Sequence, residues 1–298
     1  HGGKILFDYA RDFMDVNAAP KLDPYKPELI DVVTKLIGDR LGAEAQKRAE
    51  TQLKKFPLVS TADHHGTIDH PFWVNANVIS ALPFLEHKDP DVTSLIVLSF
   101  ASVSINNASG FARGILFHGG VGSSDNLIRL PILPDKLKMG IVHAMRAYTQ
   151  DDLNRAKDVL RAKEKEGQIA PGKAEKISAI IHEYFEADDV MKASDLSTQI
   201  TKVNYRMWPA LFHPEKGGTS SVKMLDLIYL EIETVVTELL LSRHLQEESL
   251  INRLLFTEEY RTAALELFDG IPGAFSKAKG WGTHFFWGID AQHRRVQM

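Results

Sequence analysis

The 298-residue chain contains no cysteine. This absence excludes disulfide bonds, thiolate nucleophiles and metal sites built from sulfur ligands. A chain without cysteine suits a reducing compartment, so we expect a cytoplasmic protein.

Long apolar stretches are also missing. A bilayer span needs a run of about 18 apolar residues, and no segment approaches that length. The most apolar stretch, residues 224–241, carries Asp226, Glu231, Glu233 and Glu238. The chain opens with His1-Gly2-Gly3 and shows no signal-peptide pattern. We therefore expect no membrane partner.

Several functional signatures are absent from the sequence. There is no glycine-rich dinucleotide fingerprint, kinase motif set or Gly-x-Ser-x-Gly elbow, so we expect no nucleotide cofactor and no serine hydrolase. The formal net charge of -4 and the pI of about 6.3, with basic residues scattered, argue against nucleic acid as a partner. A small-molecule substrate remains as the expected partner, and the chain can also form a homo-oligomer.

The hydrophobic pattern indicates a sheet in the first half of the chain. A short β-type run at 58–61 follows helical segments, and 93–106 begins with the continuous apolar run of a strand covered on both faces. Residues 111–118 are expected to return beside it, and 127–133 to form an edge strand because Pro131 interrupts it. We expect 93–106 to be interior, paired with 111–118 and adjacent to 58–61.

The pattern becomes helical after Pro134. Helices are expected at 135–148, 149–167, 172–185, 194–208, 224–244, 250–256 and 258–267, with 224–244 as the central buried helix. An aromatic strand at 283–289 follows and is free to join the first sheet. The prediction is an α+β fold: a mixed β-sheet in the first half, a large helical second half and a C-terminal strand. The two parts, 1–134 and 135–298, are expected to pack as one unit.

The stretch from 56 to 82 holds the densest group of ionisable side chains. Asp63, His64, His65, Asp69 and His70 surround Gly66 between a predicted strand and a helix that Pro71 begins and Pro83 ends. Such strand–turn–helix junctions often carry catalytic groups.

A metal site is one interpretation of this group. Neutral imidazole is a common metal ligand, and His65 and His70 flank a glycine turn that allows both rings to face one ion. His118, at the end of a predicted strand, is the candidate third ligand. Asp63 or Asp69 would complete the set or orient a ligating ring. The expected ion is divalent: Zn, Mn or Fe.

The triplet Asp63-His64-His65 resembles the triplet that DHH phosphoesterases carry after a strand. The resemblance covers these three residues only. The acidic metal motifs that the family has upstream are missing between Gly3 and Leu58.

Acid–base chemistry without a metal is the other functional interpretation. Asp63, His64, His65 and His70 would then be catalytic, with a carboxylate orienting a histidine. The plain structural alternative is a polar turn that caps the following helix.

Further polar residues are candidates for substrate binding, and each has an ordinary structural role as its alternative. Arg113 lies on a face of its predicted strand whose other residues are apolar. It is suited to bind an acidic group of a substrate, or to form a structural ion pair with a residue such as Glu231. The other candidates for substrate binding are polar residues near turns and helix starts, namely Asn75, Asn77, Asn106, Asn107, Lys216 and Thr219. His284, which lies within a run of aromatic residues, is a further candidate.

Two functions follow from these residues. The first is an enzyme that acts on a small polar, anionic metabolite by hydrolysis or lyase-type acid/base chemistry, with or without a metal. It predicts that the histidines converge on one cavity with Arg113. The second is a non-catalytic ligand-binding or scaffolding protein that uses its helical half, and it predicts exposed apolar surface on the helices.

Overall fold

The chain has an α+β fold. A computed structural model describes residues 3–13, 26–55, 60–69, 71–87, 89–107, 111–122, 126–218, 220, 223–271 and 287–297. Its elements up to residue 131 are α1 (Leu6–Phe13), α2 (Lys26–Leu41), α3 (Ala43–Lys55), β1 (Ser60–His64), α4 (Pro71–His87), β2 (Ser94–Phe100), β3 (Gly114–His118) and β4 (Leu127–Pro131). The remaining helices and strands are α5 (Gln150–Lys165), α6 (Lys173–Ile180), α7 (Asp188–Met191), α8 (Leu196–Phe212), β5 (Asp226–Glu231), α9 (Ile232–Leu241), α10 (Leu250–Phe256), α11 (Glu258–Phe268), β6 (Trp287–Ile289) and β7 (Arg295–Gln297). Within the described part of the chain, no helix has the length and apolarity that crossing a membrane requires.

A three-stranded parallel sheet of order β1-β2-β5 forms the centre of the molecule. The continuous apolar run in β2 is buried, as is the run from Leu227 to Leu230 in β5. Parallel strands of this kind are covered on both faces, which is why their sequences do not alternate. The carboxyl ends of all three parallel strands lie along the same edge of the sheet, the one at which the strands end.

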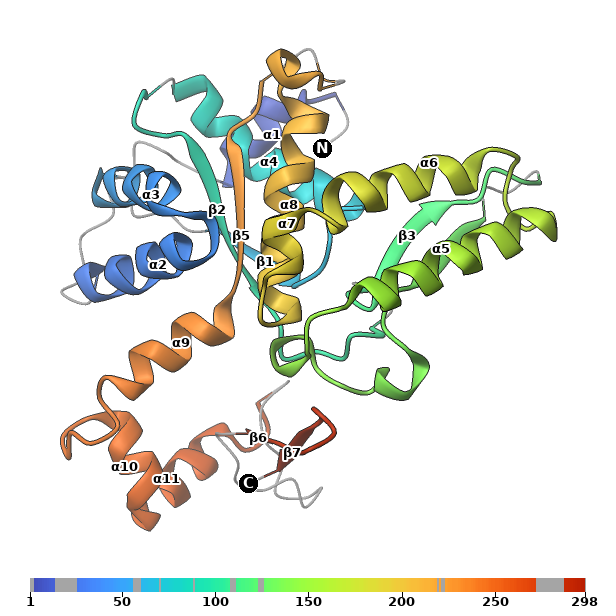
Figure 1. The fold of residues 1–298 in the computed structure, drawn as a ribbon. Helices are drawn as coiled ribbons and strands as arrows, with labels where there is room; N and C mark the ends of the chain where they lie inside the picture. The colour runs from blue at the N-terminus through green and yellow to red at the C-terminus, as the bar shows by residue number, and fades with distance from the viewer. Residues whose placement is uncertain are drawn as a thin grey trace.

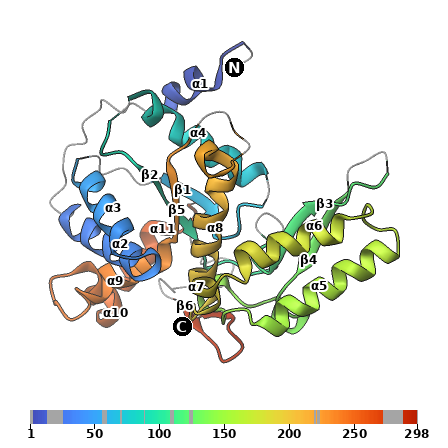
Figure 2. The same ribbon diagram turned by 45° about the horizontal axis from the view of Figure 1, so that its top comes forward.

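Helices cover both faces of this sheet (Figures 1 and 2). On one face Ile96 and Ile228 pack with Val33 and Ile37 of α2, in a cluster that also includes α3. On the other face alternate strand residues such as Val97 and Tyr229 pack against α4 and α8. The alternation of side chains along each strand thus separates two apolar layers.

The chain from β3 to α6 builds an arm that projects from the sheet (Figure 1). The antiparallel hairpin β3–β4 packs against α5 and α6, and the buried residues Ile115, Phe117, Leu130, Leu153 and Ile177 belong to one cluster. The helix expected from residue 149 is confirmed as α5, and a capping box of Thr149 and Asp152 forms its start.

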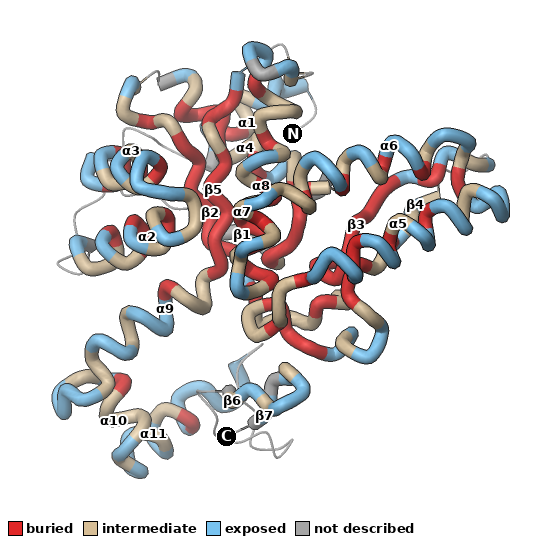
Figure 3. The backbone as a smooth tube through the Cα atoms, in the orientation of Figure 1, coloured by how far each residue is buried: buried red, intermediate tan, exposed pale blue. Residues whose placement is uncertain are grey.

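The C-terminal part extends away from the end of β5. Helices α9, α10 and α11 lead to the small β6–β7 hairpin, and Figure 3 shows much of this region as exposed or half-buried. Few of its side chains are buried, among them Val235, Ile251 and Leu265.

The predicted central helix at 224–244 is wrong. Its first part is the buried strand β5, and only Ile232–Leu241 is helical. A short apolar run fits a buried strand and a buried helix equally well, so periodicity alone did not separate them. Val236, expected inside, is 41% exposed.

The predicted strand pairing is only partly correct. Strand β2 is interior and lies beside β1, as expected, but it ends at Phe100 and its second neighbour is β5. The segment predicted to return beside it forms β3, which pairs with β4. The predicted terminal strand is confirmed at Trp287–Ile289, where it pairs with β7 instead of joining the sheet of the first half.

Two predicted helix ends and one predicted helix are also wrong. Pro83 and Pro209 lie inside the last turns of α4 and α8, so each helix continues past its proline although one i→i−4 hydrogen bond is lost there. The helix expected at 135–148 is replaced by two short 3₁₀ turns, Asp135–Leu137 and Val142–Ala144. Their backbone groups pair with neighbouring loops; for example, the Val142 amide donates to the Val103 carbonyl.

Candidate functional site

The histidine-rich turn begins at the carboxyl end of β1. His65 is fully buried there, with Nδ1 2.7 Å from the Ser99 hydroxyl and Nε2 3.0 Å from the Ser197 carbonyl oxygen. Its ring stacks on Tyr229, with centroids 5.6 Å apart. His65 therefore joins β1, β2, β5 and the first turn of α8.

These contacts define the state of the His65 ring. A carbonyl oxygen only accepts, so Nε2 carries the proton and donates to Ser197. Burial lowers the pKa of His65, although the nearby Glu231 carboxylate opposes the change. The ring is then neutral, and Nδ1 can accept the single proton of the Ser99 hydroxyl, which also lies 3.1 Å from the Leu230 carbonyl oxygen. A metal ion at His65 would have to displace one of these two hydrogen bonds.

Asn204 of α8 holds the turn that follows. Its side-chain oxygen accepts from the Ile68 amide at 2.9 Å, and its amide nitrogen donates to the Gly66 carbonyl at 2.9 Å. Asn204 is fully buried, so both bonds form away from water. The turn is fixed on the sheet-covering face of α8, and its last described residue is Asp69.

Asp69 connects this turn to the arm. One carboxyl oxygen accepts from the Leu116 amide of β3 at 2.6 Å. Burial raises the pKa of Asp69 to about 7, although hydrogen bonds from Leu116 and Thr67 favour the ionised form. The residue as a whole keeps some exposed surface, but its carboxyl group is surrounded by protein. A protonated and an ionised form therefore coexist near neutral pH.

A cavity of about 450 Å³ has Asp69 in its lining. It opens between the sheet-covering helices α4 and α8 and the arm elements β3 and α6. Most of its wall is apolar, and its polar lining consists of Asp69, Asn75 and Ser220. The apolar lining includes Val74, Ile115, Phe117, Ile180, Met207 and Leu211.

This arrangement combines two features of ligand sites. A mainly apolar cavity with a small number of polar groups suits an organic ligand. A carboxyl group with a pKa near 7 can donate or accept a proton at neutral pH. The cavity can therefore hold a small molecule against a group that is able to transfer a proton.

The predicted metal ligands are not assembled among the described residues. His65 is buried at the sheet edge, whereas β3 carries the exposed His118 to the distal end of the arm, next to the turn between α5 and α6 (Figure 1). In the part of the chain that the structure describes, no group of three His, Asp or Glu residues has the geometry to hold a metal. His70 lies outside the described residues.

The other predicted catalytic residues lie around the turn. Asp63 belongs to β1, and its side chain lies outside the description. His64 is half-buried, with its ring centroid 6.4 Å from that of Trp73. Neither His64 nor His65 lines the cavity beside Asp69.

Arg113 supports the loops of the arm. Its Nε donates to the Leu133 carbonyl at 2.8 Å, and Nη1 lies 3.1 Å from the Asp135 carboxylate and 3.3 Å from the Asn106 side-chain oxygen. The alternative of a structural pair is thus realised with Asp135 and not with Glu231. Asn107, through its backbone, donates to the Ser104 carbonyl in the same loop region.

The remaining predicted binding residues are dispersed. Asn75 lies on α4 and lines the cavity, whereas Asn77 on the same helix is buried. Lys216 ends the short 3₁₀ turn Pro214–Lys216, and its side chain is not described. Thr219 and His284 lie outside the described residues.

A buried ion pair at the carboxyl end of β5 was not predicted from the sequence. Arg40 of α2 makes two hydrogen bonds to the Glu231 carboxylate, which also accepts from Thr234. Burial alone would raise the pKa of Glu231, but the bonds and charge of Arg40 together lower it. Asn204 was missed as well, although a polar residue with low helix propensity between the apolar Val203 and Trp208 was the available signal.

No model of a known protein family, no curated protein sequence and no solved structure matches this chain. Its function has to be inferred from the chemistry of its own residues.

Proposed function

We propose that the chain is an enzyme that acts on a small organic molecule bound in the cavity beside Asp69, by hydrolysis or lyase-type acid/base chemistry. The observation that carries this proposal is a carboxyl group with a pKa of about 7 at the wall of a cavity of about 450 Å³. A general acid or base works best when its pKa lies near the working pH.

The residues that line the cavity beside Asp69 indicate how polar the proposed substrate is. The sequence suggested a polar, anionic metabolite, but the lining is mostly apolar and Arg113 is bonded to Leu133 and Asp135. An ionised substrate group close to Asp69 would be unfavourable in such surroundings. The proposed substrate therefore presents an apolar body to the cavity and a carbonyl or ester group to Asp69.

A divalent metal stays a proposal for the same turn. Its ligands would be sought at Asp63 of β1 and at His70, where a metal would polarise a carbonyl group of the substrate. Treatment with a chelator followed by metal analysis tests this part separately from Asp69.

A series of p-nitrophenyl esters with acyl chains of two to eight carbons, together with p-nitrophenyl phosphate, tests the reaction. We expect ester turnover with a pH dependence centred near 7, and at least about a 100-fold loss in Asp69→Asn. Asp31→Asn, which changes an exposed aspartate on α2, is the matched control. Equal turnover in both variants would overturn the role of Asp69.

A second function has an observation of its own in its favour. The C-terminal region from α9 to α11 carries several exposed large apolar residues, with Leu245 76%, Leu250 68%, Phe256 66% and Leu267 73% exposed. Exposed apolar side chains of this size mark interaction sites where they form a contiguous patch. The non-catalytic alternative is a scaffolding protein that uses α9–α11. Concentration-dependent self-association, measured by light scattering and removed by Leu250→Ser with Leu267→Ser, would support it.

A further inference from the structure

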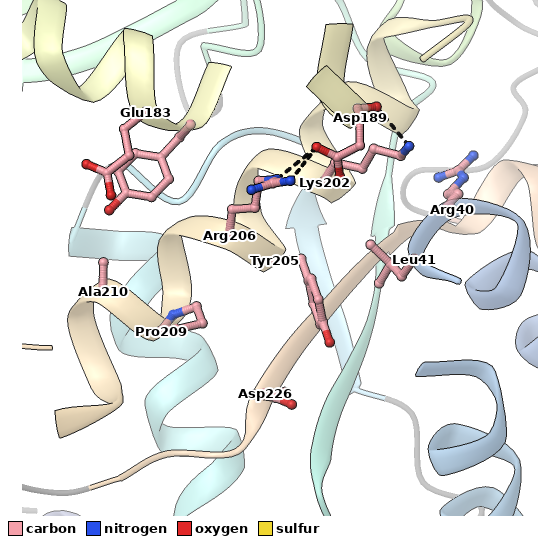
Figure 4. Close-up of a pocket in the computed structure, with 11 residues that line it drawn as sticks. Arg40, Leu41, Glu183, Asp189, Lys202, Tyr205, Arg206, Pro209, Ala210 and Asp226 are labelled. Carbon is pink, nitrogen blue, oxygen red and sulfur yellow. Dashed lines mark hydrogen bonds and ion pairs between the residues drawn. The ribbon is translucent and has the colours of Figure 1, made fainter. Parts of the chain in front are cut away.

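A second cavity, of about 610 Å³, lies on a different face of α8 from the cavity beside Asp69 (Figure 4). One stripe of the helix forms its floor: Lys202, Tyr205, Arg206, Pro209 and Ala210. Their spacing of three and four residues places them on one helix face. The end of α2, the segment Ile181–Phe185 and the start of β5 supply the walls, through Leu41, Tyr184 and Asp226 among others. We call this cavity the α8 groove.

Most charges in the α8 groove are already balanced by other residues. Arg206 binds the Asp189 carboxylate through Nε at 3.0 Å and Nη2 at 2.6 Å. Arg40 is held by Glu231. On the acidic side, Asp226 lies 3.5 Å from Arg48 and 3.4 Å from the ring of His213.

Lys202 differs from these residues. Its ammonium group donates to the backbone carbonyl of Asp189 at 2.9 Å, as the dashed line in Figure 4 shows. Among the described residues, no carboxylate lies within ion-pairing distance of it. A carbonyl oxygen satisfies one donor but does not neutralise the charge, and an ammonium group has three donors. Lys202 therefore presents a positive charge without an ion-pair partner to the α8 groove, and Glu183 presents a negative charge at another part of the lining.

Flat and apolar surfaces stand next to this charge. The ring of Tyr205 lies between Arg206 and Asp226, with Leu41 on one side of it and Pro209 and Ala210 on the other (Figure 4). Burial and a hydrogen bond to Glu183 raise the pKa of Tyr184, another lining residue, to about 12, so this phenol stays neutral. Neutral rings favour stacking with a flat ligand.

We propose that the α8 groove binds a small organic anion that carries one carboxylate or phosphate group on a flat ring. The anionic group pairs with Lys202, beside the guanidinium group of Arg206, and the ring lies on Tyr205. The site is separate from the cavity beside Asp69, so it adds a second ligand to the one in the proposed function.

Titration of the full chain with benzoate and phenyl phosphate, followed by NMR chemical shifts, tests the proposal. The two probes share a ring and differ in the anionic group, so they distinguish a carboxylate ligand from a phosphate ligand. We expect at least one to saturate, with shifts that centre on α8, and benzylamine, a cation of the same shape, to fail. Lys202→Gln should weaken the binding at least about tenfold, as expected for a lost charge-assisted bond. Lys176→Gln, at an exposed lysine on α6, should leave it unchanged.

A further variant keeps the test informative if Lys202→Gln disturbs the contact between α7 and α8. Ala210→Phe fills the groove without changing a charge, and it should also abolish binding. Asp69→Asn should bind the anion as wild type does, because its cavity lies on another face of α8. The proposal is wrong if neither anion saturates, if benzylamine binds as tightly, or if folded Lys202→Gln keeps the wild-type affinity.

Discussion

Replacing Asp69 with asparagine should stabilise the protein at pH 8 and change its stability little at pH 4. The folded chain raises the pKa of this carboxyl group to about 7, from an ordinary value of 3.8. Asparagine keeps an oxygen that accepts from the Leu116 amide, and the Thr67 hydroxyl can accept as well as donate. The substitution therefore removes the charge and preserves the main contact.

The sign of the effect follows from proton binding. Between the unfolded and the folded pKa the folded state holds a proton that the unfolded state releases, so wild-type stability falls as the pH rises from about 4 to about 7. A difference of about 3 pH units, at about 1.4 kcal/mol per unit, gives an upper limit of about 4 kcal/mol. Because the residue is partly exposed, solvent screening reduces this, and we expect about 1–3 kcal/mol at pH 8.

Urea denaturation at pH 4, 6 and 8 measures the effect, with Asp31→Asn as the exposed control. We expect the free-energy gain of Asp69→Asn over wild type to grow with pH and then to level off above pH 7. A gain that is the same at all three pH values, or a loss at pH 8, would show that the carboxyl group is not kept protonated by its surroundings. The stabilised variant should also be the inactive one, since catalytic groups are often held at the expense of stability.

Two buried networks provide further predictions. Arg40→Met leaves the Glu231 carboxylate buried without its partner, so the free energy of unfolding should fall by about 3–5 kcal/mol. The loss should be smaller when Glu231→Leu is added, because the unpaired charge is then removed. Denaturation of both single variants and the double variant measures this, and additive losses would contradict it. Ser99→Ala leaves Nδ1 of His65 without its donor, and should lower the free energy of unfolding by about 1–3 kcal/mol in thermal or urea melts. An unchanged melting temperature in Ser99→Ala would mean that His65 is held by Ser197 and Tyr229 alone.

The sequence alone determined the local order of much of the chain. The start of α5 follows from Thr149 and Asp152, whose reciprocal hydrogen bonds satisfy helix N–H groups within four residues. The interior position of β2 follows from its unbroken apolar run. The turn after β1 was located because Gly66 and its neighbours form an unusual cluster of polar and ionisable groups. In each case the deciding interactions lie close together in the chain.

The choice between strand and helix at 226–231 was made by tertiary structure. The run Leu227-Ile228-Tyr229-Leu230 fits either form, and it is a strand because β2 offers an open edge for its backbone hydrogen bonds. Likewise β3 pairs with β4 because the chain that joins them is short, whereas β2 has its two edges occupied by β1 and β5.

The roles of the site residues also depended on distant contacts. The sequence predicted catalytic or metal-binding histidines in the turn. In the folded chain His65 is buried, and it contacts Ser99, Ser197 and Tyr229 from three different elements. Asp69 gained its raised pKa from burial in the folded chain, where its carboxyl group also contacts Leu116 of the arm, 47 positions further along. The sequence determined which ionisable groups lie in the turn. Only the tertiary structure decided which of them is removed from water, and removal from water is what changes a pKa.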